Sequence, residues 1–186
     1  MRLTLPDLSL ELATDRGVFS PEAIDAGTKL LLTEAATVPA GRVDLLDLGC
    51  GYGPIAMTLA RRAPEATVWA VDVNARARAL AAANAASLGV ADRVEVRAPD
   101  DVPDDIVFGA IWSNPPIRVG KAALHELLLR WLPRLDPSVG VHAAAWLVVH
   151  KHLGSDSLAR WLGSEGYDVE RVCSRVGYRI LRVAPT

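Results

Sequence analysis

The sequence predicts an α/β protein with a mostly parallel sheet that is covered by helices on both faces. Two observations support this fold class. From residue 43 onward, short apolar runs of strand length alternate with segments that have the apolar spacing of helices. A glycine cluster at residues 49–53 follows the first of these apolar runs. In such folds a ligand crevice lies at the carboxyl ends of the strands, so this cluster marks the expected site.

The composition is typical of a globular protein, since 51% of the 186 residues are hydrophobic and 23% are charged. The formal net charge is −2, so contact with a nucleic acid would depend on a local basic patch. The two cysteines do not form a disulfide framework, and the N-terminus lacks the apolar core of a signal peptide. Every apolar stretch is far shorter than the roughly 20 residues of a membrane span. We therefore expect a cytoplasmic protein without a membrane partner.

The N-terminal elements are predicted to be a hairpin and a helix. Leucines alternate with other residues on either side of Pro6-Asp7, which is typical of two short strands. Ser20-Pro21 resembles a helix N-cap followed by proline in the first turn, and the helix is expected to continue through Ala35. We expect one domain over residues 1–186, in which residues 1–40 cap the functional site and residues 41–186 form the core.

In the core, strands are expected at residues 43–48, 67–71, 94–96, 108–113, 141–149, 169–173 and 178–183, and helices at 54–62, 76–88, 122–132 and 155–162. The last two strands are separated only by residues 174–177. A parallel connection needs a dozen or more residues, so these two strands should pair antiparallel.

The glycine cluster and a later aspartate indicate a nucleoside cofactor. Glycines at a strand-to-helix turn let the backbone approach a ligand, although steric needs of the turn would also explain them. Asp72 lies about 20 residues further on, where a carboxylate can bind ribose hydroxyls or cap the next helix. Pro54 lacks an N–H that a pyrophosphate would need, and Asp47 would repel a pyrophosphate but suits a cationic amino group. These residues favour S-adenosyl-L-methionine over NAD.

The segment Asn114-Pro115-Pro116 follows the fourth strand of the core and offers rigid hydrogen-bond acceptors. Accepting both hydrogens of a target amino group localises its lone pair and aims it at a sulfonium methyl group. Positioning and electrostatics would then supply the rate without a metal or a strong base. In isolation the segment is equally consistent with a plain strand-ending turn. Together with the glycine cluster and Asp72, it indicates methylation of an amino group.

These motifs, in this order, resemble class I methyltransferases, and in particular the small methyltransferase domain of the ribosomal RNA small-subunit methyltransferase C family. The resemblance covers nearly the whole chain and includes an N-terminal signature at residues 17–20 and 25–28. It implies a Rossmann-like fold with a seven-stranded, mostly parallel sheet whose last strand is antiparallel. It also implies that the methyl acceptor is the exocyclic amine of a guanine in small-subunit ribosomal RNA.

The resemblance also implies the roles of the site residues. The methionine part of the cofactor is assigned to Thr28, Asp47, Gly49, Gly51 and Gly53, and the nucleoside part to Asp72, Val73 and Asp100. The catalytic residues are Asn114 and Pro115, and the target is expected to contact Phe19, Pro116, Ile117, Arg118 and Lys121. Many related enzymes have an aromatic residue directly after Asn-Pro-Pro that stacks on the target base. This chain has Ile117 there, and Phe19 is the expected substitute.

An RNA-contacting patch is expected to comprise Arg118, Lys121, Arg175 and Arg179. His150 and His152 flank Lys151, but the sequence offers no third ligand, so we expect no metal. Arg76 and Arg78 are expected to form a solvated helix face. Two other functions stay open: methylation of a protein glutamine amide or a small molecule, and a non-catalytic scaffold that binds the cofactor. We expect a monomer or a weak homodimer.

Overall fold

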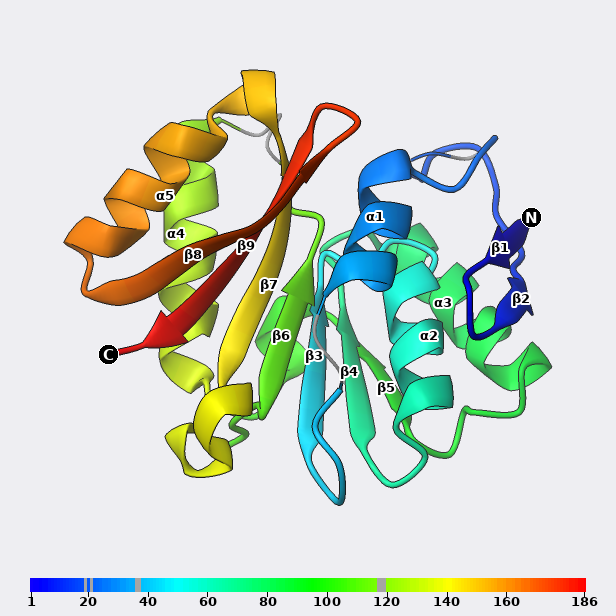
Figure 1. Cartoon of the computed structure of the whole chain (residues 1–186). Helices are drawn as coiled ribbons and strands as arrows, with labels where there is room; N and C mark the ends of the chain where they lie inside the picture. Colours follow the sequence, from blue (N-terminus) through cyan, green and yellow to red (C-terminus); the bar gives the residue numbers. More distant parts are fainter. Residues whose placement is uncertain (19, 21, 36–37, 117–119) are drawn as a thin grey trace.

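The computed structural model of the chain describes residues 1–18, 20, 22–35, 38–116 and 120–186. An N-terminal hairpin is followed by a larger sheet and its helices (Figure 1). The strands are β1 (Arg2–Thr4), β2 (Ser9–Glu11), β3 (Asp44–Leu48), β4 (Thr67–Val71), β5 (Val94–Arg97), β6 (Ala110–Ser113), β7 (Ala144–His150), β8 (Tyr167–Arg175) and β9 (Tyr178–Pro185). The α-helices are α1 (Ala26–Glu34), α2 (Pro54–Arg62), α3 (Ala75–Ser87), α4 (Lys121–Trp131) and α5 (Ser155–Ser164).

The larger sheet has seven strands in the order β5-β4-β3-β6-β7-β9-β8. Neighbouring strands from β5 to β7 pair in parallel, whereas β9 pairs antiparallel with both β7 and β8. Only Val176 and Gly177 separate β8 from β9, which is too short for a parallel connection. The predicted fold class, a mostly parallel seven-stranded sheet with the last strand antiparallel, is therefore confirmed.

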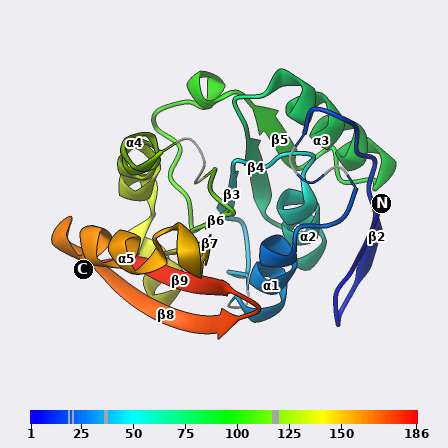
Figure 2. The same ribbon diagram turned by 90° about the horizontal axis from the view of Figure 1, so that it is seen from above.

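Helices α1, α2 and α3 pack on one face of the sheet, and α4 and α5 pack on the other (Figures 1 and 2). Successive residues of β3 enter opposite cores: Leu45 packs with the first group of helices, and Leu46 packs with the second. Side chains alternate between the faces of a strand, so a strand that is buried on both sides must be apolar nearly throughout. This explains why β4, β6 and β7 are apolar nearly throughout, whereas β3 also contains Asp44 and the fully buried Asp47.

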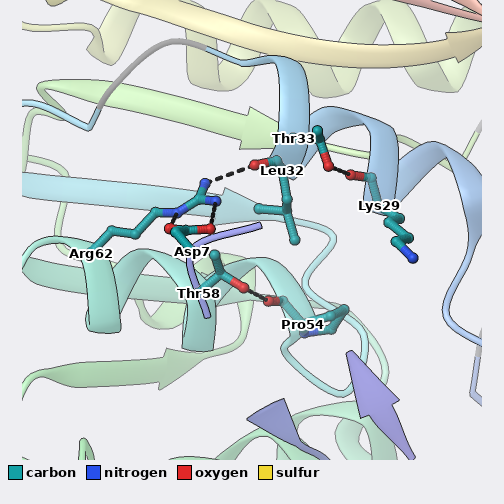
Figure 3. A network of polar contacts seen from close by, with 7 residues as sticks. All are labelled: Asp7, Lys29, Leu32, Thr33, Pro54, Thr58 and Arg62. Carbon is teal, nitrogen blue, oxygen red and sulfur yellow. Dashed lines mark hydrogen bonds and ion pairs between the residues drawn. The ribbon is translucent and has the colours of Figure 1, made fainter. Parts of the chain in front are cut away.

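The N-terminal hairpin forms as predicted, with Leu3 facing Leu10 across β1 and β2 and both side chains buried. Arg62 of α2 anchors the hairpin turn by donating hydrogen bonds to both carboxylate oxygens of Asp7, at 2.8 and 2.9 Å. The same guanidinium donates to the carbonyl oxygen of Leu32 in α1 at 2.8 Å (Figure 3). One arginine thus connects the hairpin, α1 and α2.

The predicted start of the first helix at Ser20-Pro21 is wrong. Helix α1 begins at Ala26, and Asp25 caps it by accepting a hydrogen bond from the backbone N–H of Thr28 at 2.8 Å. Ser20 instead has a φ of 53°, and its hydroxyl donates to the carbonyl oxygen of Ala23. A short polar side chain that bonds locally can stabilise a turn as well as a helix N-terminus, and here it does the former. Pro21 lies outside the described residues.

Later boundaries agree closely with the predictions, with one clear exception. Residues 54–62 and 67–71 form α2 and β4 as expected. The strand predicted to begin at residue 141 begins at Ala144, because residues Pro137–His142 form the 3-10 helix η4. Gly140 within that segment has a φ of 64°, a conformation incompatible with a strand. Across the described ranges, none of the helices combines the length and apolar character needed to cross a bilayer.

Candidate functional site

A cavity of about 480 Å³ opens at the carboxyl ends of β3, β4 and β6. Its volume falls in the usual range for small-molecule sites, and its position is the one expected for a parallel α/β sheet. The glycine loop, the end of β4 and the Asn-Pro-Pro segment all contribute to its wall. The predicted site residues that line it are Thr28, Gly49, Gly51, Asp72, Val73, Asn114, Pro115 and Pro116.

The glycine loop needs its glycines for backbone geometry. Gly49, Gly51 and Gly53 have φ angles of 76°, 58° and 90°, which residues with a side chain rarely adopt. The carboxylate of Asp72 fixes this loop to the end of β4, since one oxygen accepts from Gly51 N at 2.8 Å and the other from Asn74 N at 2.8 Å. Asp72 therefore shapes the loop in addition to lining the cavity.

Asp47 lies beneath the glycine loop and is fully buried. One of its carboxylate oxygens accepts from Ala56 N at 2.8 Å, and the other has no partner among the described residues. Burial raises the pKa of Asp47 to about 8, and the nearby charge of Asp72 adds to the effect. A buried carboxyl group with a free oxygen would be stabilised in its charged form by a cation bound above the loop.

The charged side chains of the cavity wall favour a cationic ligand. Asp25 and Asp72 line the cavity, whereas no lysine or arginine does so among the described residues. Pro54, the first residue of α2, also lines the cavity and has no N–H to donate. A pyrophosphate would find neither a basic side chain nor a full set of backbone donors here. The wall fits a positively charged ligand without phosphates.

Asn114 lies at the end of β6 and is held by the N-terminus of α1. Its Nδ2 donates to Asp25 Oδ2 at 2.8 Å and to Thr28 Oγ1 at 3.0 Å. These two bonds use both amide hydrogens, so Oδ1 is the atom left to accept a hydrogen bond from a ligand. The Asn-Pro-Pro segment also lies beside the glycine loop, since a Cβ placed on Gly49 would be 3.9 Å from Pro116 Cδ.

Several predicted residues lie away from this wall. Asp100 belongs to the short helix η1 (Pro99–Asp101), where its side chain is 89% exposed and accepts from Arg130 at 2.9 Å. Its neighbour Pro99 lines the cavity instead. Gly53 is the N-cap of α2, and Lys121 is exposed at the start of α4. Phe19, Ile117 and Arg118 lie outside the described residues.

Four cavity residues carry roles that the sequence did not suggest. Asp25 holds Asn114, and Tyr52, His150 and Tyr178 complete the wall. Burial and the charge of Asp25 raise the pKa of Tyr52 to about 12, and the same two causes raise the pKa of Tyr178. Both phenols therefore keep their protons at neutral pH. Little in the sequence indicated that Tyr178 and His150 line the cavity, because the two residues come together only through the register of β7 and β9.

Of the two arginines predicted to form a solvated helix face, Arg76 is exposed and Arg78 is half-buried. Arg78 Nη1 donates to the carbonyl oxygens of Asp72 and Val73, at 2.7 and 3.0 Å. Arg76 forms an ion pair with Asp15. The prediction of a solvated helix face therefore holds for Arg76, which also contacts the segment after the N-terminal hairpin, and is wrong for Arg78, which holds the turn after β4.

A buried asparagine joins α3 to two distant segments. Asn84 Oδ1 accepts from Ala13 N at 2.7 Å, and Nδ2 donates to Ala13 O at 3.0 Å and to Tyr52 O at 2.8 Å. Tyr52 belongs to the glycine loop, whereas Ala13 follows β2. The glycine loop and the N-terminal segment are thus both hydrogen-bonded to the side chain of Asn84.

The expected basic patch is partly neutralised. Arg175 forms an ion pair with Glu34 at 2.7 Å. Arg179 is paired with Asp156 and also donates to Ser155 Oγ at 2.9 Å. Lys121 is exposed. Within the described part of the chain, no group of three or more histidine, cysteine or carboxylate side chains is placed to hold a metal ion.

The sequence matches the methyltransferase small domain family over residues 9–182. The protein YbxB of Bacillus subtilis (strain 168) is 33% identical over 172 residues, covering 91% of this chain and 83% of that protein. The ribosomal RNA small subunit methyltransferase C of Shewanella loihica is 33% identical over 161 residues, covering 86% of this chain and 46% of that protein. The chain thus spans about half the length of these methyltransferase C relatives.

A solved structure has the same fold. The Thermus thermophilus 16S rRNA N2 G1207 methyltransferase, solved in complex with AdoMet and guanosine, superimposes with a TM-score of 0.81 at 20% sequence identity. The comparison covers 100% of this chain and 50% of that one. The architecture described above is therefore shared with a larger protein.

Proposed function

Because the chain belongs to the methyltransferase small domain family, we propose that it transfers a methyl group from S-adenosyl-L-methionine to the exocyclic amine of a guanine in small-subunit ribosomal RNA. The observation that carries this proposal is the fixed amide of Asn114, whose two Nδ2 hydrogens are bound by Asp25 and Thr28. The relatives named ribosomal RNA small subunit methyltransferase C support the choice of RNA. The chain is proposed to act in the cytoplasm as a monomer or a weak homodimer.

Different residues around the cavity would bind different parts of the cofactor. Asp47 and the glycine loop would hold the methionine part, and Thr28 would bind near its carboxylate. Asp72 would accept hydrogen bonds from the ribose, and Val73 would contact the adenine. Asp100 lies outside the cavity wall and pairs with Arg130, so it would reach the adenine only if its side chain turned inward. The absence of basic side chains among the described lining residues fits a ligand with a sulfonium and an ammonium group. When bound, this cofactor supplies an electrophilic methyl group.

The chain then needs only to orient the target amine. The Oδ1 atom of Asn114 and the carbonyl oxygen of Pro115 would each accept one of its hydrogens, which localises the nitrogen lone pair and directs it toward the methyl group. Asn114 cannot rotate freely, because Asp25 and Thr28 hold its amide nitrogen. A preorganised acceptor costs no reorganisation during the reaction, so this arrangement lowers the barrier without a general base.

A second candidate is a methyltransferase that acts on a protein glutamine amide or a small molecule. The pairing of Arg175 with Glu34 and of Arg179 with Asp156 favours it, because these contacts reduce the basic surface available to RNA. Two fixed acceptors at Asn114 and Pro115 would also suit the amino group of a glutamine amide or of a small molecule. A scaffold without catalytic activity is disfavoured by the intact and fixed Asn114.

One labelling experiment separates these functions. The protein is incubated with methyl-labelled S-adenosyl-L-methionine and, in parallel, with naked ribosomal RNA, intact small subunits, total protein and a metabolite extract. The proposal expects label in RNA, recovered as N2-methylguanosine, and almost none with the Asn114→Ala variant. Label in protein or metabolites would replace the RNA proposal with the second candidate. If no fraction takes up label, the non-catalytic scaffold becomes the favoured function.

A further inference from the structure

Two aromatic rings stand beside the Asn-Pro-Pro segment in the cavity. His150 ends β7 and Tyr178 begins β9, and their Cα atoms are paired in the antiparallel ladder. Paired residues on neighbouring strands project to the same face. Their ring centroids are 5.0 Å apart, and the ring planes are at 90°. Both side chains line the cavity together with Asn114 and Pro116.

Two glycines leave room for these rings. A Cβ on Gly27 of α1 would lie 2.7 Å from Tyr178 Cε1 and 2.9 Å from Tyr178 Cδ1, closer than carbon atoms can approach. A Cβ on Gly177 would lie 3.0 Å from His150 Nε2. Gly27 lies within α1 and does not have a positive φ, so its backbone angles do not require glycine. The packing therefore fixes the Tyr178 ring between α1 and His150.

A planar target base can be oriented by stacking on an aromatic ring such as that of Tyr178. Ile117 directly follows Asn-Pro-Pro and has no π-face to offer. Stacking on an aromatic side chain is tolerant of base identity and orients the plane of the base, which an aliphatic side chain does poorly. Once the base plane is set, the direction of its exocyclic amine relative to Asn114 is set as well.

We propose that Tyr178, whose ring packs perpendicular to that of His150, forms the stacking wall for the target base and takes the place of an aromatic residue after Asn-Pro-Pro. This inference rests on the proposed function and deepens it by naming the residue that orients the acceptor. Tyr178 is a binding residue for a heteroaromatic base, and His150 acts through Tyr178 as a positioning residue. The proposal also gives a reason for Gly27 in the N-terminal signature, where any side chain would displace the ring.

The test compares Tyr178→Leu with Tyr178→Phe in the full chain, using the ribosomal RNA fraction that accepts label. Tyr178→Leu should raise the KM for RNA by about 5- to 100-fold, as loss of one base-stacking contact does. Tyr178→Phe keeps the ring and should keep the KM near that of the wild type. Calorimetry with S-adenosylhomocysteine should give unchanged affinity for both variants. If Tyr178 had a purely structural role, the affinity for S-adenosylhomocysteine would fall in Tyr178→Leu as well. Tyr167→Leu is the matched control, because Tyr167 lies on β8 and packs against the opposite core.

A second variant moves the ring without removing it. Gly27→Ala should also raise the KM for RNA, and this effect should vanish in the Tyr178→Leu background if it acts through the ring. An effect that persists there would come from Asp25, whose Oδ2 would lie 2.9 Å from the new Cβ, and would count against the proposal. If Tyr178→Leu methylates RNA with an unchanged KM, the stacking wall is wrong and the proposed function stands. If wild-type protein labels no RNA, the proposed function fails and the stacking wall fails with it.

Discussion

Asn114 Nδ2 donates a hydrogen bond to Asp25 Oδ2 across 2.8 Å, although the two residues are 89 positions apart in the sequence. The same carboxylate oxygen accepts from Thr28 N and so caps α1. The start of a helix and the orientation of the proposed catalytic amide therefore depend on one atom. A change at Asp25 should consequently affect both stability and rate.

Asp25→Ala should lower kcat by about 10- to 100-fold, since loss of a positioning contact misplaces Asn114. It should also destabilise the fold by about 1 kcal/mol through loss of the N-cap. Single-turnover kinetics and thermal unfolding measure the two effects. Asp136→Ala is the control, because Asp136 also accepts a capping bond, from Ser138 N, but caps η4 instead of α1. Equal kcat values for the two variants would refute the positioning role.

Asn114→Ala should lower the methyl-transfer rate by about 100-fold or more, as the removal of one transition-state acceptor does. The affinity for S-adenosylhomocysteine should change little, because the lost oxygen faces the target amine. Stopped assays with saturating RNA and calorimetry give the two values. If rate and cofactor affinity fell together, Asn114 would be structural and the proposed mechanism would be wrong.

Asp72→Ala should weaken S-adenosylhomocysteine binding by about 1.5–3 kcal/mol, the range for a lost charge-assisted hydrogen bond. The structure adds a second reason, because Asp72 also holds Gly51 N and Asn74 N at the edge of the cavity. Calorimetry of the variant and of Asp92→Ala, an exposed aspartate next to the strand β5, provides the comparison. Unchanged affinity, or tighter binding of NADH than of S-adenosylhomocysteine, would overturn the cofactor assignment.

Asp47 should make the ligand-free protein less stable as the pH rises. Burial raises its pKa from 3.8 to about 8, so between these values the folded state holds a proton that the unfolded chain has lost. The stabilising contribution is fully present below pH 3.8 and is lost as the pH rises through about 8. Asp47→Asn keeps an acceptor for Ala56 N and should flatten the dependence of Tm on pH in this window. An Asp92→Asn control should keep the wild-type profile, and a D47N profile identical to it would contradict the prediction.

If RNA is the substrate, its binding should depend on salt through the residues next to Asn-Pro-Pro. Each phosphate contact adds about −0.7 to −0.9 to the slope of log affinity against log salt concentration. Replacing Arg118 and Lys121 with alanine should therefore make the slope shallower by about one to two units and leave S-adenosylhomocysteine binding intact. Arg2→Ala, on the distant N-terminal hairpin, should leave the slope unchanged. A flat slope for the wild-type protein would argue for the second candidate substrate.

The sequence was sufficient to predict the sheet and the three motifs of the cavity. Leu45 and Leu46 are both buried, so the central strands appear as mostly apolar runs, and the short link between β8 and β9 predicts that these two strands pair antiparallel. The carboxyl ends of parallel strands lie on one edge, which places the glycine loop, Asp72 and Asn114 together.

The sequence did not predict the contacts that depend on the register of paired strands. Tyr178 and His150 become cavity residues because of how β9 pairs with β7, and a local pattern does not encode that pairing. The start of α1 was misplaced for a related reason, since Ser20 and Asp25 are both good capping residues. Asp25 is the residue that caps α1, and its further partner Asn114 lies far along the chain, where a local pattern does not reveal it.

The amide of Asn84 has a practical consequence for spectroscopy. Because this side chain binds both Ala13 and the carbonyl oxygen of Tyr52, the backbone N–H of Ala13 is connected to the glycine loop through a single residue. Its hydrogen-exchange rate and its NMR resonance should therefore change when a ligand binds against the loop. Ala13 offers a reporter of cavity occupancy that needs no label within the cavity itself.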